Sequence, residues 1–132
     1  YKGGLRGVYT MSQKKIVFAE DDRLVSHAYT AGLEHAGYTV IPAKDGVKAL
    51  EKIKQEKPDL VLLDLMMPVK DGFAVLEELQ QDKEFSEIPI IVFSNSDEAK
   101  NVERAKKLGA RDFLMKVDLT VKEVVEKIKK YI

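Results

Sequence analysis

The chain has 132 residues, which fits one domain, and 45% of them are hydrophobic, which is enough for a sizeable core. Lys and Arg together number 22, as do Asp and Glu, and this balance argues against a general binder of nucleic acid or of membrane surfaces. Because the chain has no cysteine, disulfides, zinc–thiolate sites and cysteine nucleophiles are excluded, and a cytoplasmic setting is favoured.

The start of the chain differs in composition from the rest. Residues 1–13 carry three glycines and no clear periodicity, so we expect a disordered or vector-derived leader there and one domain over residues 14–132. No stretch approaches the roughly 20 apolar residues that span a bilayer, so we expect no membrane partner.

From residue 14 onward, short apolar runs alternate with amphipathic stretches. The runs are rich in Val, Ile, Leu and Phe and predict strands at residues 16–19, 38–41, 60–63, 90–93 and 113–115, the second one ended by Pro42. The stretches that follow them have helical spacing and predict helices at residues 23–36, 47–56, 73–83, 98–108 and 121–132. Strict alternation of nearly continuous apolar strands with helices predicts a doubly wound α/β domain with a five-stranded parallel sheet and five helices.

The first and last predicted helices carry the clearest patterns. Leu24, Ala28 and Ala31 share one face of the first helix, and Gly37 is its expected stop. The last helix begins with a capping box of Thr120 and Glu123. Its apolar stripe consists of Val121, Val125, Ile128 and Ile132.

Groups that carry chemistry follow four of the five predicted strands. Glu20 and Asp21 come after the first strand, Asp64 after the third, Ser94 after the fourth and Lys116 after the fifth. In a doubly wound sheet these strand ends lie at one edge, where such domains bind ligands. Clustered carboxylates with no cysteine and no histidine pair favour a hard cation such as Mg²⁺. Asp64 is then the best-placed nucleophile, and Lys116 and Ser94 could bind a phosphoryl group.

Each of these residues also has an ordinary structural interpretation. Asp21 or Asp22 could cap the first helix, and Asp64 could shape the turn that follows it. Ser94 could begin a turn or a helix, and Lys116 could be a solvated lysine. No single residue decides between the two interpretations, and the argument rests on their meeting at one edge of the sheet.

The strand ends resemble bacterial response-regulator receiver domains of two-component signalling, in particular the single-domain receivers of chemotaxis type. The matching stretches are KIVFAEDD at residues 15–22, LVLLDLMMPVKDG at 60–72, IPIIVFSNS at 88–96 and GARDFLMK at 109–116. The resemblance covers residues 14–132 and implies a flavodoxin-like fold with strand order 2-1-3-4-5.

The resemblance implies a role for each residue at the strand ends. Asp64 corresponds to the phosphoacceptor, and Mg²⁺ is expected on Glu20, Asp21, Asp64 and the backbone carbonyl of Met66. Lys116 and Ser94 correspond to the residues that bind the phosphoryl group.

Further positions correspond to the switch and to residues that tune rates. Ser94 and Phe113 match the switch hydroxyl and aromatic, and the side chains of Met66 and Asn95 flank the path of the hydrolytic water. The chain departs from the family pattern at Val117, where proline is usual, and we expect Lys116 to reach Asp64 nevertheless.

The implied function is a signalling switch that assists its own phosphorylation and dephosphorylation and is not otherwise an enzyme. Its expected donor is a phosphohistidine on a sensor histidine kinase or on a histidine phosphotransfer protein. Phosphorylation is expected to change the surface of helix 4, strand 5 and helix 5, which would control a downstream protein or form a dimer, with no direct contact to nucleic acid.

Three alternative functions fit the sequence less well. A degenerate receiver would bind partners without phosphorylation, but every group that the reaction needs is present in the sequence. A phosphohydrolase of the haloacid dehalogenase type would want a second aspartate at Met66. A nucleotide-binding Rossmann module would need a glycine-rich fingerprint after the first strand, which the sequence lacks.

Overall fold

The computed structural model describes residues 13–95 and 99–132. The predicted leader therefore lies outside the described residues, apart from Gln13. The described part forms a five-stranded sheet in the order β2-β1-β3-β4-β5, with every neighbouring pair parallel. The strands are β1 (Lys15–Ala19), β2 (Thr39–Ala43), β3 (Leu60–Leu63), β4 (Ile90–Ser94) and β5 (Asp112–Met115). The predicted fold class and strand order are confirmed.

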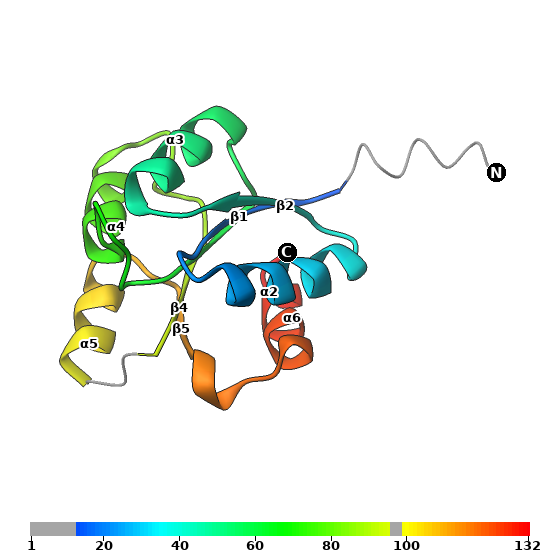
Figure 1. The fold of residues 1–132 in the computed structure, drawn as a ribbon. Helices are drawn as coiled ribbons and strands as arrows, with labels where there is room; N and C mark the ends of the chain where they lie inside the picture. The colour runs from blue at the N-terminus through cyan, green and yellow to red at the C-terminus, as the bar shows by residue number, and fades with distance from the viewer. Residues whose placement is uncertain (1–12, 96–98) are drawn as a thin grey trace.

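Five α-helices in the described residues connect and follow the strands, as predicted (Figure 1). They are α2 (Arg23–His35), α3 (Gly46–Glu56), α4 (Gly72–Gln81), α5 (Ala99–Lys107) and α6 (Val121–Lys129), with a short 3-10 turn, η2 (Lys116–Asp118), before the last. None of the helices in the described part of the chain has the length and apolar character needed to cross a membrane.

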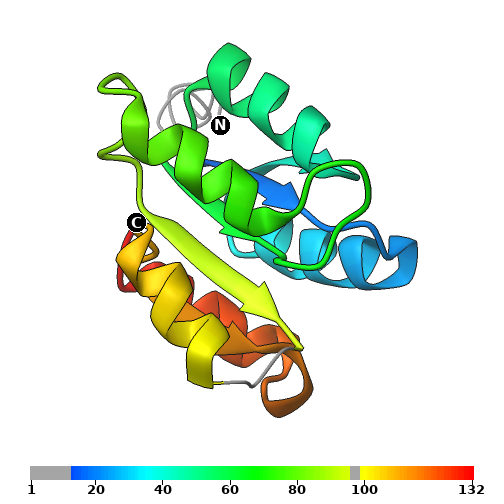
Figure 2. The same ribbon diagram turned by 90° about the vertical axis from the view of Figure 1, so that its left-hand side faces the viewer.

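The helices cover the two faces of the sheet in two layers. Helices α3, α4 and α5 lie on one face and α2 and α6 on the other, so that in the turned view of Figure 2 the first group lies in front. Because successive strand residues point to opposite faces, Val17 and Ala19 join one apolar cluster, whereas Ile16 and Phe18 join the other. The core is therefore split by the sheet, and the strands are buried on both sides.

Helix α2 faces the sheet with a different set of residues from the one that we predicted. Leu24 is 82% exposed, and Ala28 and Ala31 are exposed as well. The buried side carries Leu33, with Val25, Tyr29 and Ala36 packed against the same apolar cluster. The predicted face was wrong because the helix has two apolar stripes, and the one with the larger side chains fills the space against the sheet.

The predicted second strand ended too early. Strand β2 runs through Pro42 to Ala43, where Pro42 lies opposite Phe18. Proline lacks a backbone N–H and is tolerated in an edge strand, because one side of that strand has no neighbour to bond. Since β2 is the edge of this sheet, Pro42 does not end it.

The ends of the other elements agree more closely with the sequence. Thr120 and Glu123 form the predicted capping box, and Gly37 and Gly109 have positive φ angles of 102° and 104° just beyond helix ends. Helix α6 ends at Lys129, three residues before the predicted end at 132. Beyond it, the Tyr131 hydroxyl donates to the Asp112 carboxylate at 3.1 Å, at the surface and not in the core.

Candidate functional site

The register of the sheet brings the predicted site residues to one edge. Ala19 is level with Leu63, Leu63 with Val92, and Ser94 with Met115, so the strands finish close to one another. The residues that follow β1, β3 and β5 are Glu20, Asp64 and Lys116, and Ser94 is the last residue of β4. This convergence is what the sequence predicted.

Asp64 lies at the centre of this edge. It is 4% exposed, and its backbone N–H donates to the Ala19 carbonyl at 3.0 Å, which ties it to β1. One carboxylate oxygen accepts from the Met66 backbone N–H at 3.2 Å, and the other accepts from the Lys116 ammonium at 3.1 Å. Lys116 therefore reaches Asp64 with Val117 in the following position, as expected.

Glu20 is a second buried carboxylate on the same lysine. It is 3% exposed, forms an ion pair with Lys116 and accepts a hydrogen bond from the Asp22 backbone N–H at 3.0 Å. Burial raises the pKa of Glu20 above its ordinary value, although the hydrogen bonds from Lys116 and Asp22 act in the opposite direction. Burial would lower the pKa of Lys116, but the hydrogen bond to Glu20 and the charge of Asp64 outweigh it and raise that pKa. The lysine is thus held as a cation between two carboxylates.

Asp21 completes an acidic cluster with Glu20 and Asp64. One carboxylate oxygen from each of the three lies within 4.8 Å of the others, and Asp21 is exposed. The helix cap is Asp22, whose carboxylate accepts from the N–H groups of Leu24 and Val25, so Asp21 is left to face the cluster. Three carboxylates with one lysine leave an excess of negative charge, and an all-oxygen donor set suits a hard cation such as Mg²⁺.

The loop after Asp64 passes very close to the start of α4. A Cβ atom on Gly72 would lie 2.4 Å from the Asp64 carbonyl oxygen and 2.7 Å from the Leu65 Cα atom. The Gly72 N–H donates to the Leu65 carbonyl at 3.0 Å, and the Asp71 carboxylate caps the helix by accepting from Ala74 N–H at 2.9 Å. Glycine is required here because only hydrogen fits between the helix and the backbone of Asp64.

The predicted switch and rate-tuning residues surround the same edge. Ser94 is fully buried, and Phe113 is half-buried against the apolar cluster on the side of α3, α4 and α5. Met66 is 66% exposed and Asn95 is exposed, so both side chains face solvent. These positions suit the predicted roles, which remain predictions.

Two aromatic rings, those of Phe93 and Tyr29, lie beneath Lys116 and were not predicted from the sequence. The ammonium lies 5.6 Å from the centre of the Phe93 ring, and Tyr29 packs edge-on to Phe93 with ring centres 4.9 Å apart. The Tyr29 hydroxyl donates to the Leu119 carbonyl at 3.2 Å, which links α2 to the segment after η2. Val25, Tyr29 and Leu33 are spaced four residues apart and could have indicated the buried face of α2. The face predicted from the sequence was that of Leu24, Ala28 and Ala31 instead.

Comparisons with known proteins agree with this geometry. The sequence matches the response regulator receiver domain family over residues 16–129. Protein PilH of Pseudomonas aeruginosa is 36% identical over 102 residues, which cover 77% of this chain and 84% of PilH. The alkaline phosphatase synthesis transcriptional regulatory protein PhoP of Bacillus subtilis is 37% identical over 103 residues, which cover 78% of this chain but only 42% of PhoP.

Solved structures show the same fold. The BeF3-activated N-terminal receiver domain of Klebsiella pneumoniae RstA is 32% identical, with a TM-score of 0.81 over 89% of this chain and 97% of that one. The chemotaxis protein CheY4 of Vibrio cholerae is 22% identical, with a TM-score of 0.85 over 92% of this chain and 100% of that one. The family match, these similarities and the strand-end carboxylates and lysine together identify the chain as a member of the response-regulator receiver domain family of two-component systems.

Proposed function

We propose that this receiver domain is a phosphorylation switch in which Asp64 accepts a phosphoryl group from a phosphohistidine donor. A carboxylate oxygen of Asp64 forms the new bond to phosphorus, the phosphorus–nitrogen bond to the donor imidazole breaks, and the nitrogen keeps the electron pair. The product is an acyl phosphate on Asp64. The observation that carries the proposal is the buried Asp64 carboxylate held 3.1 Å from the Lys116 ammonium, beside Glu20 and Asp21.

Glu20, Asp21, Asp64 and the Met66 backbone carbonyl would hold Mg²⁺. Their oxygen donors fit this ion, and the excess negative charge of the acidic cluster supports cation binding. When bound, Mg²⁺ supplies positive charge to the phosphoryl oxygens. Glu20 and Asp21 then serve to hold the ion, whereas Asp64 also presents the attacking oxygen.

Lys116 and Ser94 would stabilise the charge that develops on the phosphoryl group. Lys116 is held between Asp64 and Glu20 in a buried setting, where its charge is weakly screened. When Asp64 is phosphorylated, Lys116 can keep its contact with Glu20 and turn its remaining donors to a phosphoryl oxygen. Ser94 can donate its hydroxyl from the end of β4 and thereby couple phosphorylation to the position of that strand end.

The donor would approach over the first turns of α2. Leu24, Ala28 and Ala31 form an exposed apolar stripe that begins two residues after Asp22, next to the acidic cluster. A stripe of this kind beside a reactive group suits the docking of a protein such as a sensor histidine kinase or a phosphotransfer protein.

The output surface would be formed by α5, β5 and α6, which are the helix 4, strand 5 and helix 5 of the sequence prediction. Ser94 lies at the end of β4 and Phe113 on β5, so a shift of the first can bias the packing of the second. Phosphorylation then changes the populations of two packings of this surface, which binds a downstream protein or a second copy.

The test is phosphorylation of the intact protein by a small donor such as phosphoramidate. We expect mass spectrometry to show one added phosphoryl group in the presence of Mg²⁺ and much less labelling when EDTA is added. Asp64→Asn should abolish the labelling, because the amide is not a nucleophile for this reaction. Full labelling of Asp64→Asn would show that another residue accepts the phosphoryl group, and failure of the folded wild type to label would instead favour a receiver that acts without phosphorylation.

A further inference from the structure

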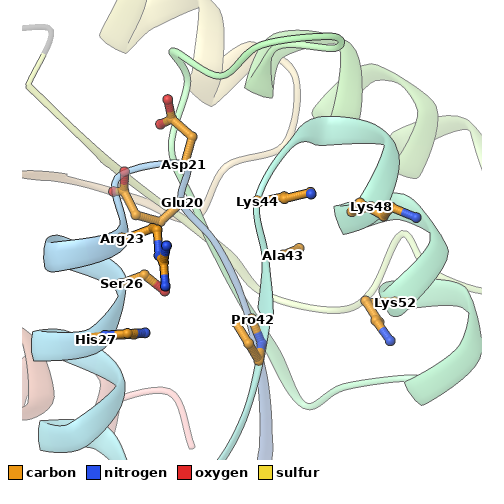
Figure 3. A pocket seen from close by; sticks show the side chains of 10 residues that line it. All are labelled: Glu20, Asp21, Arg23, Ser26, His27, Pro42, Ala43, Lys44, Lys48 and Lys52. Atoms are coloured by element: carbon orange, nitrogen blue, oxygen red, sulfur yellow. The ribbon is translucent and has the colours of Figure 1, made fainter.

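A groove with a volume of about 330 Å³ lies between α2 and α3, beside the acidic cluster (Figure 3). Glu20 and Asp21 line one end of it, and Pro42 and Ala43 of the edge strand β2 contribute an apolar surface. The phosphorylation chemistry uses none of its other residues.

Cationic and basic side chains are repeated at helical spacing along both walls. Arg23 and His27 lie four residues apart on α2, Lys48 and Lys52 lie four residues apart on α3, and Lys44 lies just before the N-cap of α3. Residues four apart share one face of a helix, so Lys48 and Lys52 are separated by roughly 6 Å along α3, and Lys44 extends the basic wall beyond the start of the helix. The groove is therefore an elongated track of positive charge.

Most of these cations have no anionic partner in the part of the chain that the structure describes. Within residues 13–95 and 99–132, Arg23, Lys44 and Lys52 take part in no ion pair, and Lys48 lies 3.6 Å from Glu51 of its own helix. Some other lysines of the domain are neutralised, for example Lys57, which pairs with Glu84 at 3.0 Å, whereas others such as Lys83 and Lys106 are unpaired among the described residues but do not line this groove. The four cations of the lining outnumber its two carboxylates, so the groove carries a local excess of positive charge.

We propose that the groove binds an extended acidic segment of a partner protein. Alternate residues of an extended chain are about 6–7 Å apart, which matches the spacing of Lys48 and Lys52 on the α3 wall, and a neighbouring carboxylate could reach Lys44. Glu20 and Asp21 repel such a segment from one end, so it would lie toward Lys48 and Lys52. The binding is independent of phosphoryl transfer to Asp64.

The exposure of the groove favours a peptide over a small phosphorylated molecule. Arg23, Lys44 and Lys48 are exposed and Lys52 is half-buried, so their ammonium and guanidinium groups meet a ligand at the surface. The deeply buried polar side chain of the lining is Glu20, a carboxylate, which would repel any anion held deep in the groove, whereas an extended segment along the exposed cations avoids it. A small phosphorylated ligand would need buried donors to hold it.

The experiment uses a fluorescein-labelled peptide of six glutamates, with binding followed by fluorescence anisotropy at low salt. The groove variant is Lys44→Glu with Lys52→Glu, and the matched control is Lys83→Glu with Lys106→Glu. Both pairs change the net charge equally, and Lys83 and Lys106 are exposed and form no ion pair among the described residues. We expect the groove variant to weaken binding by at least about tenfold and the control by less than about twofold, because only the first converts contacts into repulsions.

Further measurements make the outcome decisive. Circular dichroism checks that both variants are folded, and Lys44→Gln with Lys52→Gln replaces the groove variant if the glutamates unfold it. Asp64→Asn should bind the peptide as wild type does. Equal weakening by the two charge variants, no binding to the wild type, or displacement of the peptide by pyrophosphate at micromolar concentration would each overturn the proposal, the last in favour of a small phosphorylated ligand.

Discussion

At the scale of single residues, Lys116 is the side chain on which the site depends most. It lies between two carboxylates that are 3% and 4% exposed, over an aromatic ring that is itself fully buried. A buried charge is stable only when paired, so Glu20 and Asp64 need this cation whenever no metal is bound. Lys116 can therefore keep the site assembled before the phosphoryl group arrives.

Gly72 is the residue where a small change should disturb the site most. Gly72→Ala places a Cβ atom against the backbone of Asp64 and Leu65, so the loop after β3 must move. We expect the rate of labelling by phosphoramidate to fall by at least about tenfold, since a displacement of about 1 Å is enough for such a loss. The measurement is the time course of the mass change.

The control for this variant is Gly37→Ala. Gly37 has a φ angle of 102° and open space around its Cα atom, far along the chain from the acidic cluster. An alanine at that φ costs about 1–2 kcal/mol of stability but leaves the site intact, so the labelling rate should match wild type. If Gly72→Ala also labels at the wild-type rate, close packing against Gly72 does not position Asp64.

The sequence predicted single residues best where their position at the end of a strand determines which side chains meet. Glu20, Asp64 and Lys116 were predicted correctly to meet, because parallel strands of similar length bring their carboxyl ends to one edge. The ion pair of Lys116 with Glu20 was not predicted, and neither was the packing of Phe93 and Tyr29 beneath Lys116. The contact of Tyr29 depends on which stripe of α2 faces the sheet, and helical spacing alone did not decide between two stripes.

At the scale of elements, α2 has two apolar stripes, of which one packs against the sheet and the other is exposed. The larger side chains of Val25, Tyr29 and Leu33 pack against the sheet, and the stripe of Leu24, Ala28 and Ala31 remains exposed. Sequence reasoning treated both alanine and leucine as core residues. The structure indicates that volume decided the outcome, because the space against the sheet is filled by the larger set.

The same substitution at two positions of α2 tests this assignment. Leu33→Ala removes a fully buried side chain and should lower the free energy of unfolding by about 2–5 kcal/mol. Leu24→Ala alters an 82% exposed side chain and should change it by less than about 0.5 kcal/mol. Urea denaturation measures both values, and comparable losses would show that the exposed stripe contributes to folding.

The edge strand β2 shows a second limit of sequence reasoning. The strand was predicted to end at Pro42, but proline is tolerated in an edge strand. Whether a strand is central or at the edge depends on the order of the whole sheet, which is not visible within five residues. The family resemblance supplied the strand order, which places this strand at the edge, so combining the two would have allowed the strand to continue through Pro42.

At the scale of the whole molecule, the acidic cluster should couple metal binding to folding stability. Three carboxylates within 4.8 Å repel one another in the native state, and Mg²⁺ bound only to that state adds stability. We expect Mg²⁺ to raise the free energy of unfolding, by about 1.4 kcal/mol at a concentration about ten times its dissociation constant. The measurement is urea denaturation with Mg²⁺ or with EDTA.

Asp21→Asn should remove most of this gain, because it withdraws one exposed ligand without altering the core. In EDTA the same variant should be slightly more stable than wild type, since one repelling charge is gone. Glu77→Gln, an exposed carboxylate on α4, is the control and should keep the full Mg²⁺ effect. A wild type whose stability does not respond to Mg²⁺ would contradict the proposed metal site.

The central claim is that Asp64, and no other carboxylate, carries the phosphoryl group. Acyl phosphates are reduced by borohydride to alcohols, so a phosphorylated aspartate becomes homoserine, which peptide mapping by mass spectrometry can locate. After treatment with phosphoramidate and Mg²⁺, homoserine is expected at position 64 and at no other aspartate, including the neighbouring Asp21 and Asp22. Homoserine at Asp21, or at several aspartates alike while position 64 stays unmodified, would contradict the account.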